Sequence, residues 1–155
     1  MSATQTVLFV CTGNTCRSPM AEGLLKAALK GEADTLVASA GVAAMPGDAI
    51  SRETQDILSE KNAALKGFRS QEVSESLLKK SDIVIAMTSS HADVVRHYFP
   101  ELAEKVHLLC DFIDPEEGLA GADIPDPIGM GREAYEEVAE VMELAIPSII
   151  QTMQS

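Results

Sequence analysis

Short apolar runs alternate with amphipathic segments along the 155-residue chain. Runs of β-forming residues predict four buried strands, at 7–10, 35–38, 83–86 and 106–109. Apolar residues at helical spacing predict helices in five further segments, at 19–29, 51–58, 73–78, 92–99 and 132–149. Strands separated by helices predict an α/β fold, in which a parallel sheet carries helices on both faces and binds ligands at the carboxyl ends of its strands.

The same pattern predicts which side chains are buried and where the chain is irregular. The first helix is expected to bury one face, made of Ala21, Leu24, Leu25, Ala28 and Leu29. The second helix is expected to direct four side chains toward the core, namely Ile50, Thr54, Ile57 and Leu58. Pro147 is expected to kink or shorten the last helix. Segment 114–131, rich in Pro, Gly and Asp, is the longest predicted loop, and long loops in compact domains are often functional.

Composition narrows the possible functions. The length and the large apolar fraction predict one domain over residues 1–155 with a single core. A formal net charge of −12 opposes binding to nucleic acid or to an anionic membrane surface. Three cysteines do not suit a disulfide framework, and the chain shows neither a signal peptide nor an apolar stretch of about 18 residues. We therefore expect a cytoplasmic protein.

The turn after the first strand combines residues that suit phosphate chemistry. Cys11 ends the strand, Arg17 begins the helix, and five residues separate them. A loop this short turns its backbone N–H groups toward one centre, and the helix adds the positive end of its dipole. Arg17 supplies paired donors for phosphoryl oxygens. The same donors would stabilise a thiolate at Cys11, which predicts that Cys11 is a nucleophile.

The neighbouring residues fit this interpretation. Ser18 can hydrogen-bond the thiolate, Gly13 allows close backbone approach, and Asn14 tolerates left-handed dihedral angles. Singly, each residue has an ordinary structural explanation, and the Cys-x5-Arg spacing alone is a weak signal. The combination with the strand before it and the helix after it favours a catalytic site. Its predicted phosphate-binding residues are Thr12, Gly13, Asn14, Thr15, Cys16 and Ser18.

This segment resembles the signature loop of low-molecular-weight protein tyrosine phosphatases, which reads C-x-G-N-x-C-R-S-P near the amino terminus. Similar residues continue at 20–22, 39–41, 82–87 and 126–127. The resemblance implies a flavodoxin-like fold with a four-stranded parallel sheet in the order 2-1-3-4, and no metal or organic cofactor. It also implies that Ser39 braces Asn14 from the end of the second strand.

The resemblance further assigns an acid and leaves one cysteine open. The leaving group of a phosphate ester or amide needs a proton. The family's general acid is the Asp of a late Asp-Pro pair, which here is Asp126, and we expect no such role for Asp114 in the other pair. The alternative for Asp126 is an ordinary turn residue. For Cys16, the alternatives are the family's reversible disulfide with the nucleophile and simple packing.

Two positions bear on the substrate. Thr15 stands where tyrosine phosphatases of this family commonly carry Ile, and it resembles the protein arginine phosphatase branch. Ile128 stands where tyrosine-directed members usually place a Tyr wall for the phenyl ring, although an aromatic residue is also frequent in arginine phosphatases. The resemblance therefore favours phosphoarginine in a protein partner, with phosphotyrosine as the alternative. Neither the physiological substrate nor the oligomeric state can be read from these residues.

Two rival classes share parts of this pattern. Arsenate reductases with cysteine relays have this fold and loop, but they need further cysteines, and Cys110 is remote in sequence. A phosphate-binding module without catalysis would need Arg17 but no thiol at Cys11. The three histidines do not have metal-ligand spacing, so we expect no metal site and assign them no role, namely His91, His97 and His107.

Overall fold

The computed structural model of the protein describes residues 5–31 and 34–154. Four strands form one parallel sheet in the order β2-β1-β3-β4, which confirms the α/β fold and the strand order that the resemblance implies. The strands are β1 (Gln5–Cys11), β2 (Thr35–Gly41), β3 (Ile83–Ala86) and β4 (Val106–Leu108). Each predicted strand is present, and β2 extends three residues beyond its predicted end.

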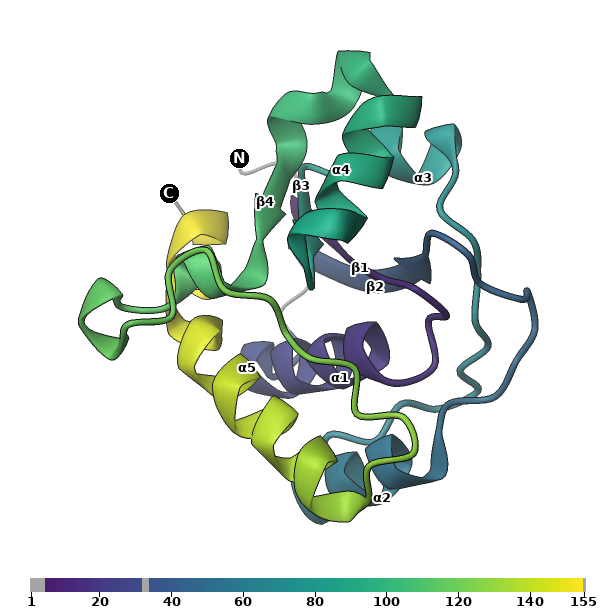
Figure 1. The fold of residues 1–155 in the computed structure, drawn as a ribbon, viewed down its shortest axis with the longest axis vertical. Helices are drawn as coiled ribbons and strands as arrows, with labels where there is room; N and C mark the ends of the chain where they lie inside the picture. Colours follow the sequence, from purple (N-terminus) through teal and green to yellow (C-terminus); the bar gives the residue numbers. More distant parts are fainter. Residues whose placement is uncertain (1–4, 32–33, 155) are drawn as a thin grey trace.

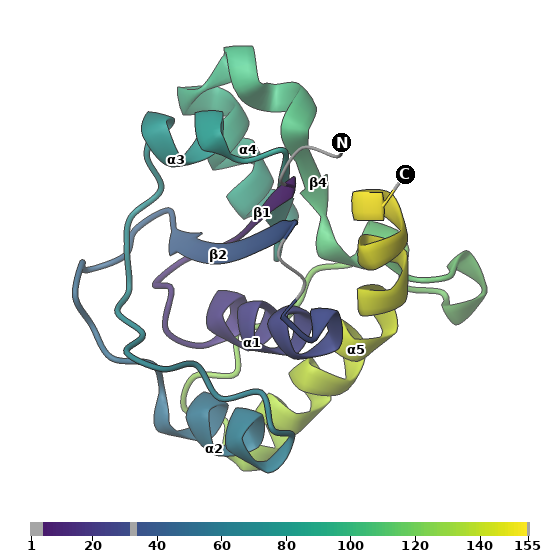
Figure 2. The same ribbon diagram turned by 180° about the vertical axis from the view of Figure 1, so that it is seen from behind.

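Helices cover both faces of the sheet, giving three layers (Figures 1 and 2). One face carries α3 (Glu75–Lys80) and α4 (Ser89–Tyr98). On the other side lie α1 (Arg17–Leu29), α2 (Arg52–Glu60) and α5 (Arg132–Gln154). Alternate side chains of β1 enter the two cores, because successive residues of a strand point to opposite faces.

Helix α1 is buried on more sides than its sequence predicts. Most of the predicted face is buried, but Ala28 is exposed, while Glu22 and Gly23 are buried. Gly23 is buried because the segment after α2 packs closely against this side of α1. A Cβ atom on Gly23 would lie 2.8 Å from the carbonyl oxygen of Ala63. Apolar periodicity predicts one buried face and carries no signal of a neighbour on the opposite side.

The remaining predicted helices are present with some shifted ends, and α4 begins three residues before its predicted start. Helix α5 continues to Gln154, so Pro147 does not shorten it, but the helix bends toward its carboxyl end (Figures 1 and 2). Helix α3 begins at Glu75, after Val73, whose N–H instead donates to the Gly41 carbonyl at 2.9 Å. Three 3₁₀ turns complete the structure, at 100–105, 109–112 and 115–117. In the described ranges, no helix combines the length and apolar character needed to cross a membrane.

Candidate active site

The loop between β1 and α1 is fastened to its surroundings by its carbonyl groups. Three of these oxygens accept backbone hydrogen bonds from the segment after β2: Cys11 O from Val42 N (2.9 Å), Thr12 O from Ala43 N (3.0 Å) and Thr15 O from Ser51 N (2.8 Å). The N–H groups of residues 13–16 make no hydrogen bond to any described residue of the chain. Their donors are therefore free to bind an anion, with the amino-terminal end of α1 directly behind them.

Asn14 holds this loop from the inside. Its φ angle of 57° lies in the left-handed region that asparagine tolerates, and its side chain is fully buried. The Nδ2 atom donates to Ser18 Oγ and to Ser39 Oγ, both at 2.9 Å. The Oδ1 atom accepts from Gln71 N at 2.9 Å. The contact that the resemblance implies between Ser39 and Asn14 is present.

The hydrogen bonds around Asn14 leave the Ser18 hydroxyl hydrogen free to point toward Cys11. Ser18 Oγ lies 2.9 Å from Cys11 Sγ. Because Ser18 Oγ already accepts from the Asn14 amide, its hydroxyl hydrogen is available to the sulfur. Ser39 directs its own hydrogen to the buried carboxylate of Glu22, at 2.6 Å from Oε1, and so also acts as an acceptor toward Asn14. The network thus allows the Ser18 O–H to donate to Cys11, which is the direction that a thiolate would require.

Arg17 is held by the late loop that precedes α5. Only 6% of its surface is exposed, and its Nη1 atom donates to Ile124 O at 2.9 Å. Its Nη2 atom lies 3.3 Å from Thr12 Oγ1 and 3.9 Å from Asp126 Oδ2. The Ile124 N–H donates in turn to Met87 O at 2.9 Å, just after β3. A backbone carbonyl therefore fixes the guanidinium, a contact that residue types cannot signal.

A small cleft of about 130 Å³ opens over the loop. It is lined by Cys11, Thr12, Gly13, Thr15, Cys16, Arg17, Asp126 and Ile128. A Cβ atom on Gly13 would meet only Thr15 Oγ1, at 3.9 Å, so the absence of a side chain leaves room for a bound group. Ile128 is 61% exposed at the rim. Of the predicted site residues, the buried Asn14, Ser18 and Ser39 lie behind this lining.

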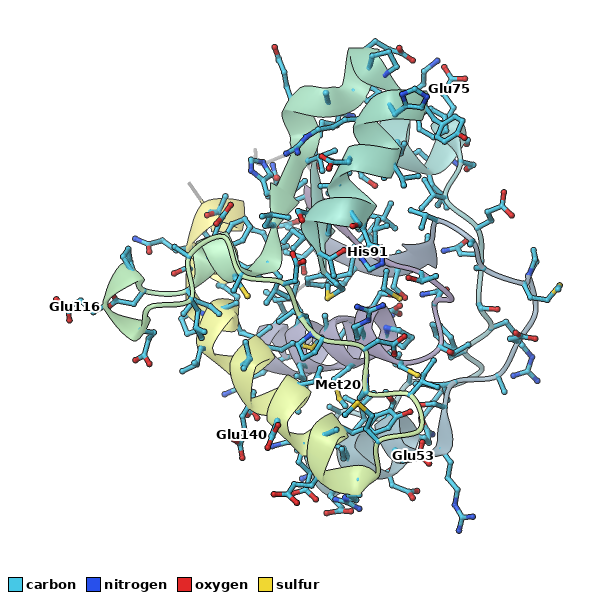
Figure 3. The ribbon with its side chains drawn as sticks, viewed as in Figure 1. Met20, Glu53, Glu75, His91, Glu116 and Glu140 are labelled. Carbon is cyan, nitrogen blue, oxygen red and sulfur yellow. The ribbon has the colours of Figure 1, made fainter. Side chains whose placement is uncertain are left out.

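The structure brings only one of the two Asp-Pro pairs to the cleft. The Asp126 carboxylate is 49% exposed and lies in the cleft wall, where its Oδ1 atom also accepts from Ile128 N at 3.1 Å. Asp114 caps a 3₁₀ turn by accepting from Glu116 N at 3.0 Å. Figure 3 shows Glu116 at the tip of a projecting loop, far from His91 and Met20. Of the two aspartates, Asp126 is therefore the one that lies at the cleft.

His91 contacts the loop although sequence analysis assigned it no role. It lies in the first turn of α4 with 5% of its surface exposed, and its Nε2 atom is 2.7 Å from Thr12 Oγ1. Burial lowers the pKa of His91 to about 4, and the Arg17 charge adds to the effect, while Asp123 and Asp126 act in the opposite sense. The histidine is therefore neutral near pH 7. Because 79 residues separate it from Thr12, no local motif could have signalled the contact.

All three cysteines are buried free thiols. Cys16 Sγ lies 3.6 Å from the hydroxyl of Tyr135 in α5. Burial raises the pKa of Tyr135, and the contact with Cys16 raises it further. Burial likewise raises the pKa of Cys110, which lies in the apolar core. Within the described ranges, no three His, Cys, Asp or Glu side chains gather in a group that could hold a metal ion.

Comparison with known proteins agrees with this geometry. The family model described as "Low molecular weight phosphotyrosine protein phosphatase" matches residues 6–155. The protein-arginine-phosphatase of Bacillus subtilis is 36% identical to this chain, and the alignment covers 88% of this chain and 89% of the relative. The probable low molecular weight protein-tyrosine-phosphatase AmsI of Erwinia amylovora is 34% identical, and the alignment covers 90% of each chain. The solved YwlE arginine phosphatase from Geobacillus stearothermophilus is 35% identical, with a TM-score of 0.87 over 97% of this chain and 93% of its own. The chain therefore belongs to the low molecular weight phosphotyrosine protein phosphatase family.

Proposed function

We propose that this phosphatase acts through a phosphocysteine intermediate on Cys11. The observation that carries the proposal is the Ser18 hydroxyl at 2.9 Å from Cys11 Sγ, at the base of a loop of free N–H groups. A buried cysteine that served only for packing would need neither this donor nor the cleft above it.

The proposed first step transfers the phosphoryl group to sulfur. The Cys11 thiolate attacks phosphorus while the bond from phosphorus to the leaving oxygen or nitrogen breaks, and Asp126 gives its proton to the leaving atom. In the second step water attacks phosphorus, Asp126 takes the water proton, and the P–S bond breaks to release phosphate and the thiolate. Arg17 and the loop N–H groups hold the phosphoryl oxygens in both steps. Ser18 stabilises the thiolate that departs in the second.

We propose phosphoarginine in proteins as the substrate. Thr15 lines the cleft, and its hydroxyl can accept a hydrogen bond from the guanidinium N–H groups of phosphoarginine, which a phenyl ester lacks. Ile128 at the rim offers no aromatic ring to a phenyl group. Relatives named as arginine phosphatases support this choice. Phosphotyrosine is the second candidate, supported by the relatives named as tyrosine phosphatases at slightly lower identity.

An acid-quench experiment tests the chemical step. With a 32P-labelled phosphopeptide, the wild type is expected to yield trapped phosphocysteine and Cys11→Ala none. Asp126→Asn should slow turnover, whereas Asp114→Asn, altered in the other Asp-Pro pair, should match the wild type. Absence of both hydrolysis and trapped intermediate in the wild type would indicate a phosphate-binding module. Arsenate reduction supported by thioredoxin would instead indicate a reductase, although the buried Cys110 is poorly placed for a relay.

Competition between two peptides tests the substrate. A phosphoarginine peptide and a phosphotyrosine peptide of the same sequence context are mixed, and the ratio of their kcat/KM values is measured. Thr15→Val removes the hydroxyl at nearly constant volume, and Thr15→Ile also adds bulk. Both variants should shift the ratio toward phosphotyrosine. A wild-type preference for phosphotyrosine would defeat the arginine assignment and leave the phosphocysteine mechanism intact.

A further inference from the structure

Thr12 lies where the loop, the buried guanidinium and helix α4 meet. Its side chain is exposed and lines the cleft. Its Oγ1 atom lies 3.3 Å from Arg17 Nη2 and 2.7 Å from His91 Nε2. The Arg17 contact has a fixed direction, because a guanidinium only donates hydrogen bonds. Thr12 Oγ1 is therefore an acceptor toward Arg17, and the direction of its bond to His91 depends on where the histidine carries its proton.

The burial of His91 decides between the two neutral forms. The Nδ1 atom is buried and has no hydrogen-bond partner among the described residues. A proton on Nδ1 would leave a buried N–H donor unpaired, which native structures avoid more strictly than an unpaired acceptor. The proton is therefore assigned to Nε2, with Nε2–H as the donor to Thr12 Oγ1. The lowered pKa of His91 agrees with a neutral ring beside Arg17.

This assignment accounts for every hydrogen around the Thr12 oxygen. Two lone pairs of Oγ1 accept, one from His91 and one from Arg17, which is the full acceptor capacity of a hydroxyl. The hydroxyl hydrogen then has no acceptor among the described residues. Because Thr12 lines the cleft, the remaining direction leads toward the space above Cys11.

We propose that the Thr12 hydroxyl donates a hydrogen bond to a phosphoryl oxygen of the substrate, and that His91 is a positioning residue that holds the hydroxyl in this orientation. This inference rests on the proposed phosphatase mechanism and adds a side-chain donor to the backbone N–H groups of the loop. Charge on the phosphoryl oxygens changes as the leaving group departs, so a fixed donor stabilises the transition state without reorganisation. In this proposal the orienting contact comes from α4, on the other face of the sheet from α1, where Figure 3 shows His91.

Matched substitutions at Thr12 and His91 test the proposal. Thr12→Val removes the hydroxyl from an exposed position at nearly constant volume, and kcat/KM for the phosphopeptide is expected to fall by about 10- to 100-fold. Thr12→Ser keeps the hydroxyl and should therefore lose much less activity than Thr12→Val. Thr12→Val should also weaken orthovanadate, a transition-state analogue, more than inorganic phosphate. His91→Gln places an amide N–H near the Nε2 position and should retain more activity than His91→Leu.

The double variant separates positioning from general damage. If His91 acts through the Thr12 hydroxyl, His91→Leu should reduce kcat/KM much less in the Thr12→Val background than in the wild type. Multiplicative losses, or unchanged activity and vanadate affinity in Thr12→Val, would overturn the proposal. If His91→Leu fails to fold, Thr12→Val and Thr12→Ser still decide whether the Thr12 hydroxyl binds the phosphoryl group, and His91→Gln tests the positioning role. Wild-type turnover in the same assay separates this failure from a failure of the phosphatase mechanism.

Discussion

Asn14 should be the most sensitive single position behind the active site. Its side chain makes three buried hydrogen bonds, to Ser18, to Ser39 and from the Gln71 N–H. Its backbone has a φ angle of 57°, which costs alanine about 1 kcal/mol relative to residues that tolerate it. Each lost hydrogen bond contributes about 1 kcal/mol, and somewhat more where a buried partner remains unpaired. Asn14→Ala should therefore lower the free energy of unfolding by about 3 to 5 kcal/mol.

The chain contains a matched control for the backbone contribution. Asn62 has the same φ angle of 57°, but it is exposed and makes none of the buried side-chain bonds of Asn14. Asn62→Ala should lower the free energy of unfolding by about 1 kcal/mol, and Asn62→Gly should be nearly neutral. Asn14→Gly removes the conformational cost but not the lost network, so it should recover only about 1 kcal/mol of the Asn14→Ala loss.

Urea denaturation followed by circular dichroism measures these differences, with activity assayed on the same samples. For a chain of this length, the expected Asn14→Ala loss corresponds to a fall in Tm of about 6 to 20 °C. Activity should fall further than the folded fraction explains, because Ser18 loses the amide contact that holds its hydroxyl beside Cys11. Equal destabilisation by Asn14→Ala and Asn62→Ala would refute the reasoning, since the buried network would then contribute nothing.

Three further outcomes follow from the structure. Gly41→Ala should abolish most activity in a folded protein, measured as kcat at a temperature below Tm, because its Cβ would overlap the Thr12 carbonyl oxygen and displace the loop. Ser18→Ala should slow breakdown of the phosphocysteine by about 10- to 100-fold, seen in rapid-quench experiments as a larger trapped fraction. The pKa of His91 is lowered to about 4, so its contribution to stability is complete above about pH 6.5 and declines as the pH falls toward 4. His91→Gln should therefore lose less stability than the wild type between pH 7 and about pH 4.5 in urea titrations, and an equal loss would count against this assignment.

The fold could be predicted because each element carries a local pattern. Buried parallel strands consist of short apolar runs, and the loop residues from Cys11 to Arg17 follow one of them directly. These loop residues lie close together because they are neighbours in the sequence. The burial of Glu22 could not be predicted in this way, because a charged residue on a helix is normally exposed. Here it accepts from Ser39, whose strand lies beside α1 only in the folded molecule.

Two other contacts were beyond sequence reasoning for different physical reasons. Ile124 binds Arg17 through its backbone carbonyl, so the identity of its side chain carries no information about the contact. His91 reaches Thr12 because β3 lies beside β1 in the sheet and α4 follows β3. Strand order was implied by resemblance, but the side-chain direction of one histidine in the first turn of a helix was not. Metal-ligand spacing was the wrong test for this residue, because its contact is with the Thr12 hydroxyl and involves neither of the other histidines.

The arrangement of the site separates its chemistry from its selectivity. Asn14, Ser18 and Arg17 are buried, and each is held by hydrogen bonds to its surroundings: Asn14 bonds Ser18, and Arg17 bonds the Ile124 carbonyl. Thr15 and Ile128 lie on the cleft lining, and Ile128 is 61% exposed. Substitution at exposed positions seldom changes stability by more than about 0.5 kcal/mol. Under the proposed function, selectivity between phosphoarginine and phosphotyrosine can therefore change through the cleft lining while the buried residues behind it stay the same.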